Sequence, residues 1–109
     1  MYFQYNLDEQ QLRLLHSIIP SLNTKEVLGY IEDGDLHMLD RMKAYLVSSV
    51  TYNDHPMYAD SMIIIAKNDF TAIEYYNDLT GLAGSIMGII SEHPDKMNVI
   101  EIQPPQDVA

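Results

Sequence analysis

Residues 62–81 read MIIIAKNDFTAIEYYNDLTG and place the strongest strand signal of the chain directly before a complete helix signal. The consecutive apolar residues 62–66 are typical of a strand that is buried on both faces. Asn68 or Asp69 then supplies an N-cap, and Gly81 supplies the left-handed residue that ends many helices. The inward side chains of this helix are expected to be Phe70, Ile73, Tyr76 and Leu79.

Strands are predicted on both sides of this strand-helix unit. Downstream, the apolar runs 86–90 and 99–102 are expected to form a hairpin around the loop Glu92-His93-Pro94-Asp95. Upstream, residues 47–52 finish a preceding helix or form a strand, and their β-branched side chains and the following turn Asn53-Asp54-His55-Pro56 favour the strand. The C-terminal half is therefore predicted to run roughly ββαββ.

The chain opens with a short aromatic strand followed by a helix. In Tyr2–Tyr5, Phe3 and Tyr5 fall on one face because successive strand residues alternate. Asn6 with Glu9 three residues later has the pattern of a capping box at a helix start. The apolar residues that recur at helical spacing are Leu12, Leu15, Ile18, Ile19 and Leu22.

Two shorter helices are predicted before the C-terminal half. Asn23 with Glu26 forms a second capping box, Gly34 ends that helix, and Asp35 caps the next one. The apolar residues assigned to these two helices are Val27, Leu28, Ile31, Leu36, Leu39, Met42 and Leu46. The predicted fold is α+β, with a helical N-terminal half packed on a mainly antiparallel sheet of four to five strands.

A chain of 109 residues has the usual length of one domain. With 47% hydrophobic residues it is expected to fold despite its charge. Residues 1–103 are predicted to form a single compact acidic domain. Because Pro104 and Pro105 cannot donate to a strand ladder, residues 104–109 are predicted to be a flexible C-terminal tail.

The charge balance limits the possible partners. Sixteen acidic and six basic side chains give a formal net charge of -10. Proteins that bind DNA or RNA directly gain affinity from Lys and Arg that displace counterions, so direct nucleic-acid binding is not expected. The expected partner is instead a basic protein surface.

The chain contains no cysteine, which excludes disulfides, thiolate catalysis and Cys-ligated metals. The first residues have neither a basic segment nor a long apolar one, and the longest apolar run is far too short to cross a bilayer. The protein is therefore expected to be cytoplasmic and to have no membrane partner.

No catalytic motif is recognisable. There is no Gly-x-Ser-x-Gly elbow and no glycine-rich phosphate loop, so no catalytic residue and no cofactor are assigned. Two acid-His-Pro tripeptides are the strongest metal candidate, because His55 and His93 with their neighbouring acids Asp54 and Glu92 have the side chains that zinc or manganese prefers. Ordinary turn chemistry is the favoured explanation of both tripeptides, so no metal ligand is assigned.

Two acidic segments are the candidate binding residues. Glu32, Asp33 and Asp35 form a concentrated negative corner with no basic neighbour in sequence before Arg41. Farther along, Glu74 and Asp78 stand one helical turn apart without a cation at helical spacing, and Tyr75 lies between them on the outer side of the helix. The alternative interpretation of both segments is an ordinary solvated surface.

These observations favour a non-enzymatic acidic binding protein. The expected activity is inhibition, by occupying a basic, nucleic-acid-binding surface of another protein, as phage or mobile-element anti-defence proteins of similar size and charge do. The alternative is a self-associating structural or accessory domain, in which a sheet edge at Tyr2–Tyr5 or 99–102 pairs with a second copy as a homodimer. A minor alternative is a metal-dependent enzyme that uses the two acid-His-Pro loops.

Overall fold

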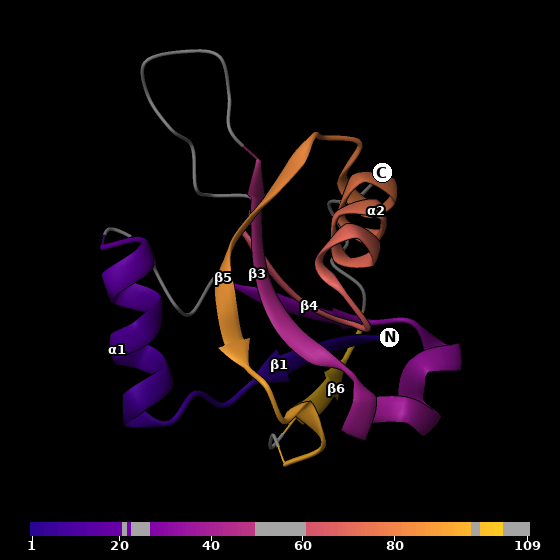
Figure 1. The fold of residues 1–109 in the computed structure, drawn as a ribbon, viewed down its shortest axis with the longest axis horizontal. Coiled ribbons are helices and arrows are strands. Elements are labelled where there is room, and N and C mark those ends of the chain that lie inside the picture. Colours follow the sequence, from indigo (N-terminus) through magenta and orange to yellow (C-terminus); the bar gives the residue numbers. More distant parts are fainter. Residues whose placement is uncertain (21, 23–26, 50–60, 97–98, 104–109) are drawn as a thin grey trace.

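A computed structural model of the chain shows a mixed six-stranded sheet with an α-helix packed on each face (Figure 1). The structure describes residues 1–20, 22, 27–49, 61–96 and 99–103. The elements are β1 (Tyr2–Tyr5), α1 (Glu9–Ile18), β2 (Leu28–Ile31), η2 (Asp33–Arg41), β3 (Lys43–Ser49), β4 (Met62–Ala66), α2 (Asp69–Thr80), β5 (Gly84–Ser91), η4 (Pro94–Lys96) and β6 (Val99–Ile102). The two η elements are 3-10 helices.

The strand order is β5-β3-β4-β2-β1-β6, and β2 and β4 form the parallel pair of the sheet. The remaining pairings are antiparallel. β4 is buried along its whole length because it is paired on both sides and covered on both faces. Its unbroken apolar sequence follows from this position.

Alternate residues of the central strands face two separate cores. Ala44 and Leu46 of β3 pack with Leu15 of α1, whereas Tyr45 and Val47 pack with Tyr76 of α2. Since successive strand residues point to opposite sides, α1 and α2 cover opposite faces of the sheet. The predicted faces of β1 are confirmed, because Phe3 and Tyr5 are both buried.

Helix α2 follows the predicted caps. The side chain of Asn68 accepts a hydrogen bond from the Thr71 amide at 2.8 Å, and Gly81 ends the helix with a φ of 72°. The inward face differs from the prediction in several positions. Tyr76 is fully buried and Leu79 packs against the core, as predicted, but Phe70 is 66% exposed and Ile73 is half-buried. Ala72, which was not predicted to face inward, is fully buried.

Helix α1 begins two residues later than predicted. Asp8 is the N-cap, and its capping box closes with Gln11, not with Glu9. Glu9 and Arg13, one helical turn apart on α1, form a salt bridge at 2.8 Å. Ile19, the residue before Pro20, is extended, as a residue before proline should be.

The prediction of a helix that ends at Gly34 is wrong, because residues 28–31 of that segment form strand β2. Gly29 and Ile31 are buried on one face, and Leu28 and Tyr30 are half-buried on the other. Apolar residues in so short a run match helical spacing by coincidence, and pairing with β1 and β4 fixes the strand instead. The capping box proposed at Asn23 and Glu26 lies outside the described residues.

The third predicted helix is shorter than expected. It is the irregular 3-10 helix η2, whose N-cap is Glu32, and it ends at Met42. The chain then enters β3, so Leu46 lies in a strand and not on a helix. The strand predicted at 47–52 therefore begins earlier, and residues 50–52 lie outside the described residues.

The predicted hairpin of 86–90 with 99–102 is also wrong. β5 and β6 lie at opposite edges of the sheet, joined through η4, because β5 pairs with β3 and β6 pairs with β1. The α+β class is confirmed, but the sheet has six strands, and the N-terminal half contributes β1 and β2 besides its helices. The single domain of residues 1–103 stays a prediction, and the tail 104–109 lies outside the described residues.

Gly29 provides a direct test of the β1–β2 packing. A Cβ added to it would lie 2.1 Å from Phe3 Cε2, inside a core where Phe3 is fully buried. We expect Gly29→Ala to destabilise the fold by about 1–3 kcal/mol because the ring must move. Gly34→Ala, where no atom of the described residues lies within 4 Å of the added Cβ, should change stability little in the same urea titration. Equal effects of the two substitutions would contradict this register.

Tyr5 makes stability depend on pH in alkaline solution. Burial, and then the charge of Asp8, raises the pKa of its hydroxyl from the ordinary 10.0 to about 12. Between these values the unfolded chain has released the proton and the folded chain keeps it, so rising pH favours unfolding. We expect the urea midpoint to fall as pH rises from 10 to 12, and to fall less steeply in Tyr5→Phe. Parallel pH profiles of the two proteins would contradict this assignment.

Candidate acidic binding face

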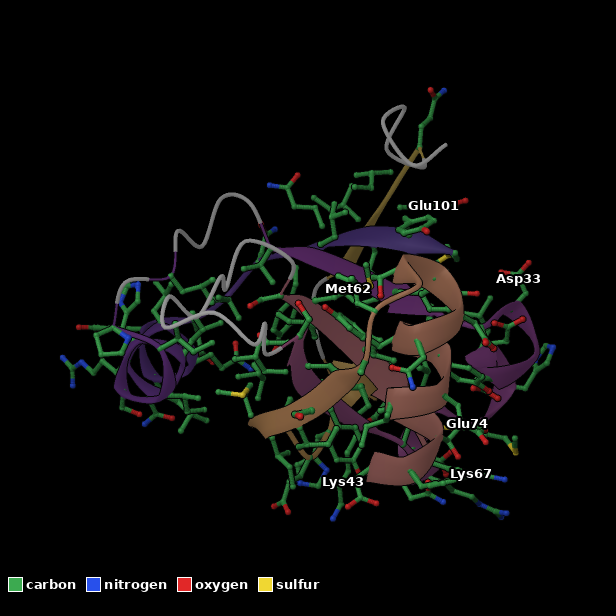
Figure 2. All side chains as sticks on the ribbon, turned by 90° about the horizontal axis from the view of Figure 1, so that it is seen from above. Asp33, Lys43, Met62, Lys67, Glu74 and Glu101 are labelled. Atoms are coloured by element: carbon green, nitrogen blue, oxygen red, sulfur yellow. The ribbon has the colours of Figure 1, made fainter. Side chains whose placement is uncertain are left out.

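The two predicted acidic segments lie on the same side of the molecule. η2 follows β2 directly and begins beside α2, so Asp33 and Glu74 are found on one side in Figure 2. The electrostatic influence of Glu32, Asp35 and Glu74 converges on the Tyr75 hydroxyl. We call this surface the acidic face; it consists of Glu32, Asp33, Asp35, Glu74 and Asp78.

Two tyrosines connect the segments of the acidic face. The Tyr75 hydroxyl of α2 donates to Asp35 Oδ2 at 3.2 Å, and the Tyr30 hydroxyl of β2 donates to Glu32 Oε2 at 2.5 Å. The Tyr30 and Tyr75 rings meet edge to face with centroids 6.4 Å apart. Tyr2 of β1 continues the series, 5.3 Å from Tyr30 in the same edge-to-face arrangement.

The helix α2 determines which of its side chains reach this site. Tyr75, Asp78 and Leu79 are three and four residues apart, so they share one face of the helix. Tyr76 lies on the inward face, as predicted, and is completely buried. Tyr75 is not simply an outer residue as predicted, because it is half-buried between α2 and the end of β2.

The acidic face is poorly neutralised. In the described part of the chain, salt bridges join Arg13 to Glu9, Lys43 to Glu92, and the Met1 ammonium to Asp33 at 3.3 Å. Helical spacing would pair Lys43 with Asp40. Lys43 instead forms its salt bridge with Glu92, which directly follows β5. Among those residues, Glu32, Asp35, Glu74 and Asp78 form no salt bridge.

The environment of the two tyrosines keeps both hydroxyls protonated. Burial raises the pKa of Tyr30 above its ordinary value, and the hydrogen bond to Glu32 raises it further. Burial likewise raises the pKa of Tyr75, followed by the charge of Asp35. Both hydroxyls therefore remain hydrogen-bond donors at neutral pH, and both direct their proton to a carboxylate.

A cavity opens beside the two tyrosines. Its volume is about 360 Å³, and the described residues that line it are Tyr30, Glu32, Tyr75, Asp78 and Leu79. We call it the tyrosine hollow. It is open to solvent on one side, and its wall combines aromatic rings, one aliphatic side chain and carboxylates.

The sequence located most of this site but missed Tyr30. The six candidate residues all lie on or beside the acidic face: Glu32, Asp33, Asp35, Glu74, Tyr75 and Asp78. Tyr30 was missed because its segment was assigned to a helix. The β-branched and aromatic residues around Gly29 were the signal for a strand that would have placed it beside Glu32.

The two acid-His-Pro tripeptides do not form a described site. Residues 54–56 lie outside the described residues, so the structure does not test whether His55 and His93 converge. In the part of the chain that the structure describes, no group of three or more His, Asp or Glu side chains is arranged to hold a metal ion. Within the same residues, no helix has the length and apolar character needed to span a bilayer.

Comparison with known protein families, with curated proteins and with solved structures finds no match.

Proposed function

We propose that the protein is a non-enzymatic binding protein whose acidic face occupies a basic surface of another protein, a surface that otherwise binds nucleic acid. Proteins that block such surfaces, including phage and mobile-element inhibitors of host defence, need negative charges held on a rigid support. A cytoplasmic location belongs to the same proposal.

The observation that carries this proposal is the meeting of carboxylates from η2 and α2 around Tyr75, with a salt bridge only to Asp33 among the described residues. Like charges held together raise the energy of the free protein, and a cationic partner relieves this repulsion. Hydrogen bonds from Tyr30 and Tyr75 fix two of these carboxylates, so less side-chain entropy is lost on binding.

Capture from a cell extract tests this function. The immobilised chain is incubated with extract and eluted with salt in one sample and with duplex DNA in another. We expect one or a few nucleic-acid-binding proteins in both eluates, because DNA phosphates and the acidic face would compete for the same cations. Proteins that resist both eluents, or an empty eluate, would contradict the proposal.

Self-association is the second candidate, and the position of β6 favours it. β6 stands at one edge of the sheet, and Ile100 is 51% exposed. The alternative edge considered from the sequence, Tyr2–Tyr5, is wrong, because β1 is paired on both sides. Sedimentation at several concentrations distinguishes the two functions, since pairing through β6 predicts a mass that rises to that of a dimer.

A further inference from the structure

We propose that the tyrosine hollow receives one arginine side chain of the basic partner and holds it by its guanidinium group. This inference rests on the proposed function, and it adds the chemical group that is recognised and the residues that recognise it.

The hydrogen-bonding groups of the hollow select a donor. The hydroxyl groups of Tyr30 and Tyr75 already donate hydrogen bonds to Glu32 and Asp35. The ionised carboxylates of Asp78 and Glu32 accept hydrogen bonds but cannot donate them. Among the described residues that line the hollow, no side chain has a free N–H or O–H to offer. A ligand that enters it must therefore bring hydrogen-bond donors.

The charge and the aromatic walls select a cation. Neither Glu32 nor Asp78 has a salt bridge within the described residues, so both are available to a positive group. The ring faces of tyrosine attract cations as well, and this attraction strengthens where water is partly excluded. Leu79 contributes an apolar wall suited to the methylene groups of a long basic side chain.

The arrangement of the walls favours guanidinium over ammonium. The hollow's acceptors come from two elements, Glu32 at the end of β2 and Asp78 on α2, and the two tyrosine rings line the same hollow. A guanidinium is planar, stacks on a ring, and directs five N–H groups outward in its plane, so it can reach acceptors on different sides. An ammonium concentrates its three donors at one tip and is more strongly hydrated.

Titration with a single amino acid tests this inference on the whole chain. Ring-labelled tyrosine signals are followed by NMR at low salt while N-acetyl-arginine methylamide is added, and Tyr30→Phe and Tyr75→Phe spectra identify the two rings. We expect saturable shifts of both signals with a Kd on the order of 10 mM, typical of so small a ligand. The neutral citrulline analogue should give no saturable shift, and the lysine analogue should bind at least about threefold more weakly.

A pair of isosteric variants separates the hollow from general charge attraction. Asp78→Asn removes one charge from the wall of the hollow, and the control Asp95→Asn removes one charge from the exposed residue Asp95 of η4. We expect Asp78→Asn to raise the Kd for the arginine probe about three- to tenfold and Asp95→Asn to change it less than about twofold. Absent saturation, equal binding of citrulline, tighter binding of lysine, or equal effects of the two variants would each overturn the inference.

The outcomes also separate this inference from the proposed function. If the arginine probe does not bind but reversing charges on the acidic face still weakens the captured partner, the hollow is not the arginine site and the function stands. If the probe binds as expected but no captured protein is displaced by DNA, the proposed function fails and the arginine site stands.

Discussion

Tyr76→Ala is expected to lower the free energy of unfolding by about 3–5 kcal/mol, which is a large part of the total stability of a domain of this size. The Tyr76 side chain is fully buried between α2 and the sheet. Its ring also fills the space beside Gly84, where an added Cβ would lie 2.5 Å from Tyr76 Cδ1. Truncation therefore leaves a cavity that the sheet cannot close.

Phe70→Ala is the matched control, because it truncates an aromatic residue on the same helix. Phe70 is 66% exposed, so its loss should change stability by no more than about 0.5 kcal/mol. Urea titrations of both variants measure the difference. Equal destabilisation would mean that α2 packs on the sheet through a different face.

The second large effect concerns binding. Reversing Glu74 and Asp78 to lysine is expected to weaken the complex with a captured partner at least about 100-fold at low salt, because like charges would then face each other across the interface. Both residues are exposed and neither forms a salt bridge in the described part of the chain, so folding should be preserved. Isothermal titration calorimetry at two salt concentrations measures the effect.

Reversal of Asp95 and Glu101 provides the control with the same net charge. Glu101 lies on β6 opposite Phe3, which packs in the core on the α1 side of the sheet, and Asp95 lies in η4, so neither residue belongs to the acidic face. If only overall charge attracts the partner, both double variants should weaken binding equally. A much smaller loss in the control would assign the interaction to the acidic face.

Local signals predicted the parts of this fold that are fixed by nearby residues. The caps of α2 at Asn68 and Gly81, the buried strand β4 and the two faces of β1 follow from short-range patterns, and all are confirmed. The errors concern pairings over long distances. No local pattern in β5 or β6 indicates that β5 pairs with β3 and β6 with β1. A hairpin of β5 with β6 is therefore the simpler prediction from sequence.

The candidate site shows the same division. The acidic residues were recognisable from composition and spacing, but no local pattern predicts that Asp35 and Tyr75, forty residues apart, are in hydrogen-bonding contact. That contact depends on β2 being a strand next to β4, since this pairing carries the start of η2 to α2. The tyrosine hollow was therefore beyond prediction, because one of its walls was assigned to the wrong element.

Displacement of labelled duplex DNA from the captured partner tests the central claim most directly. If the acidic face occupies the partner's nucleic-acid-binding surface, the unmodified chain and the Asp95/Glu101 reversal should both release the DNA, whereas the Glu74/Asp78 reversal should release almost none. Undisturbed DNA in the presence of saturating unmodified chain, or equal release by both reversal variants, would contradict the claim.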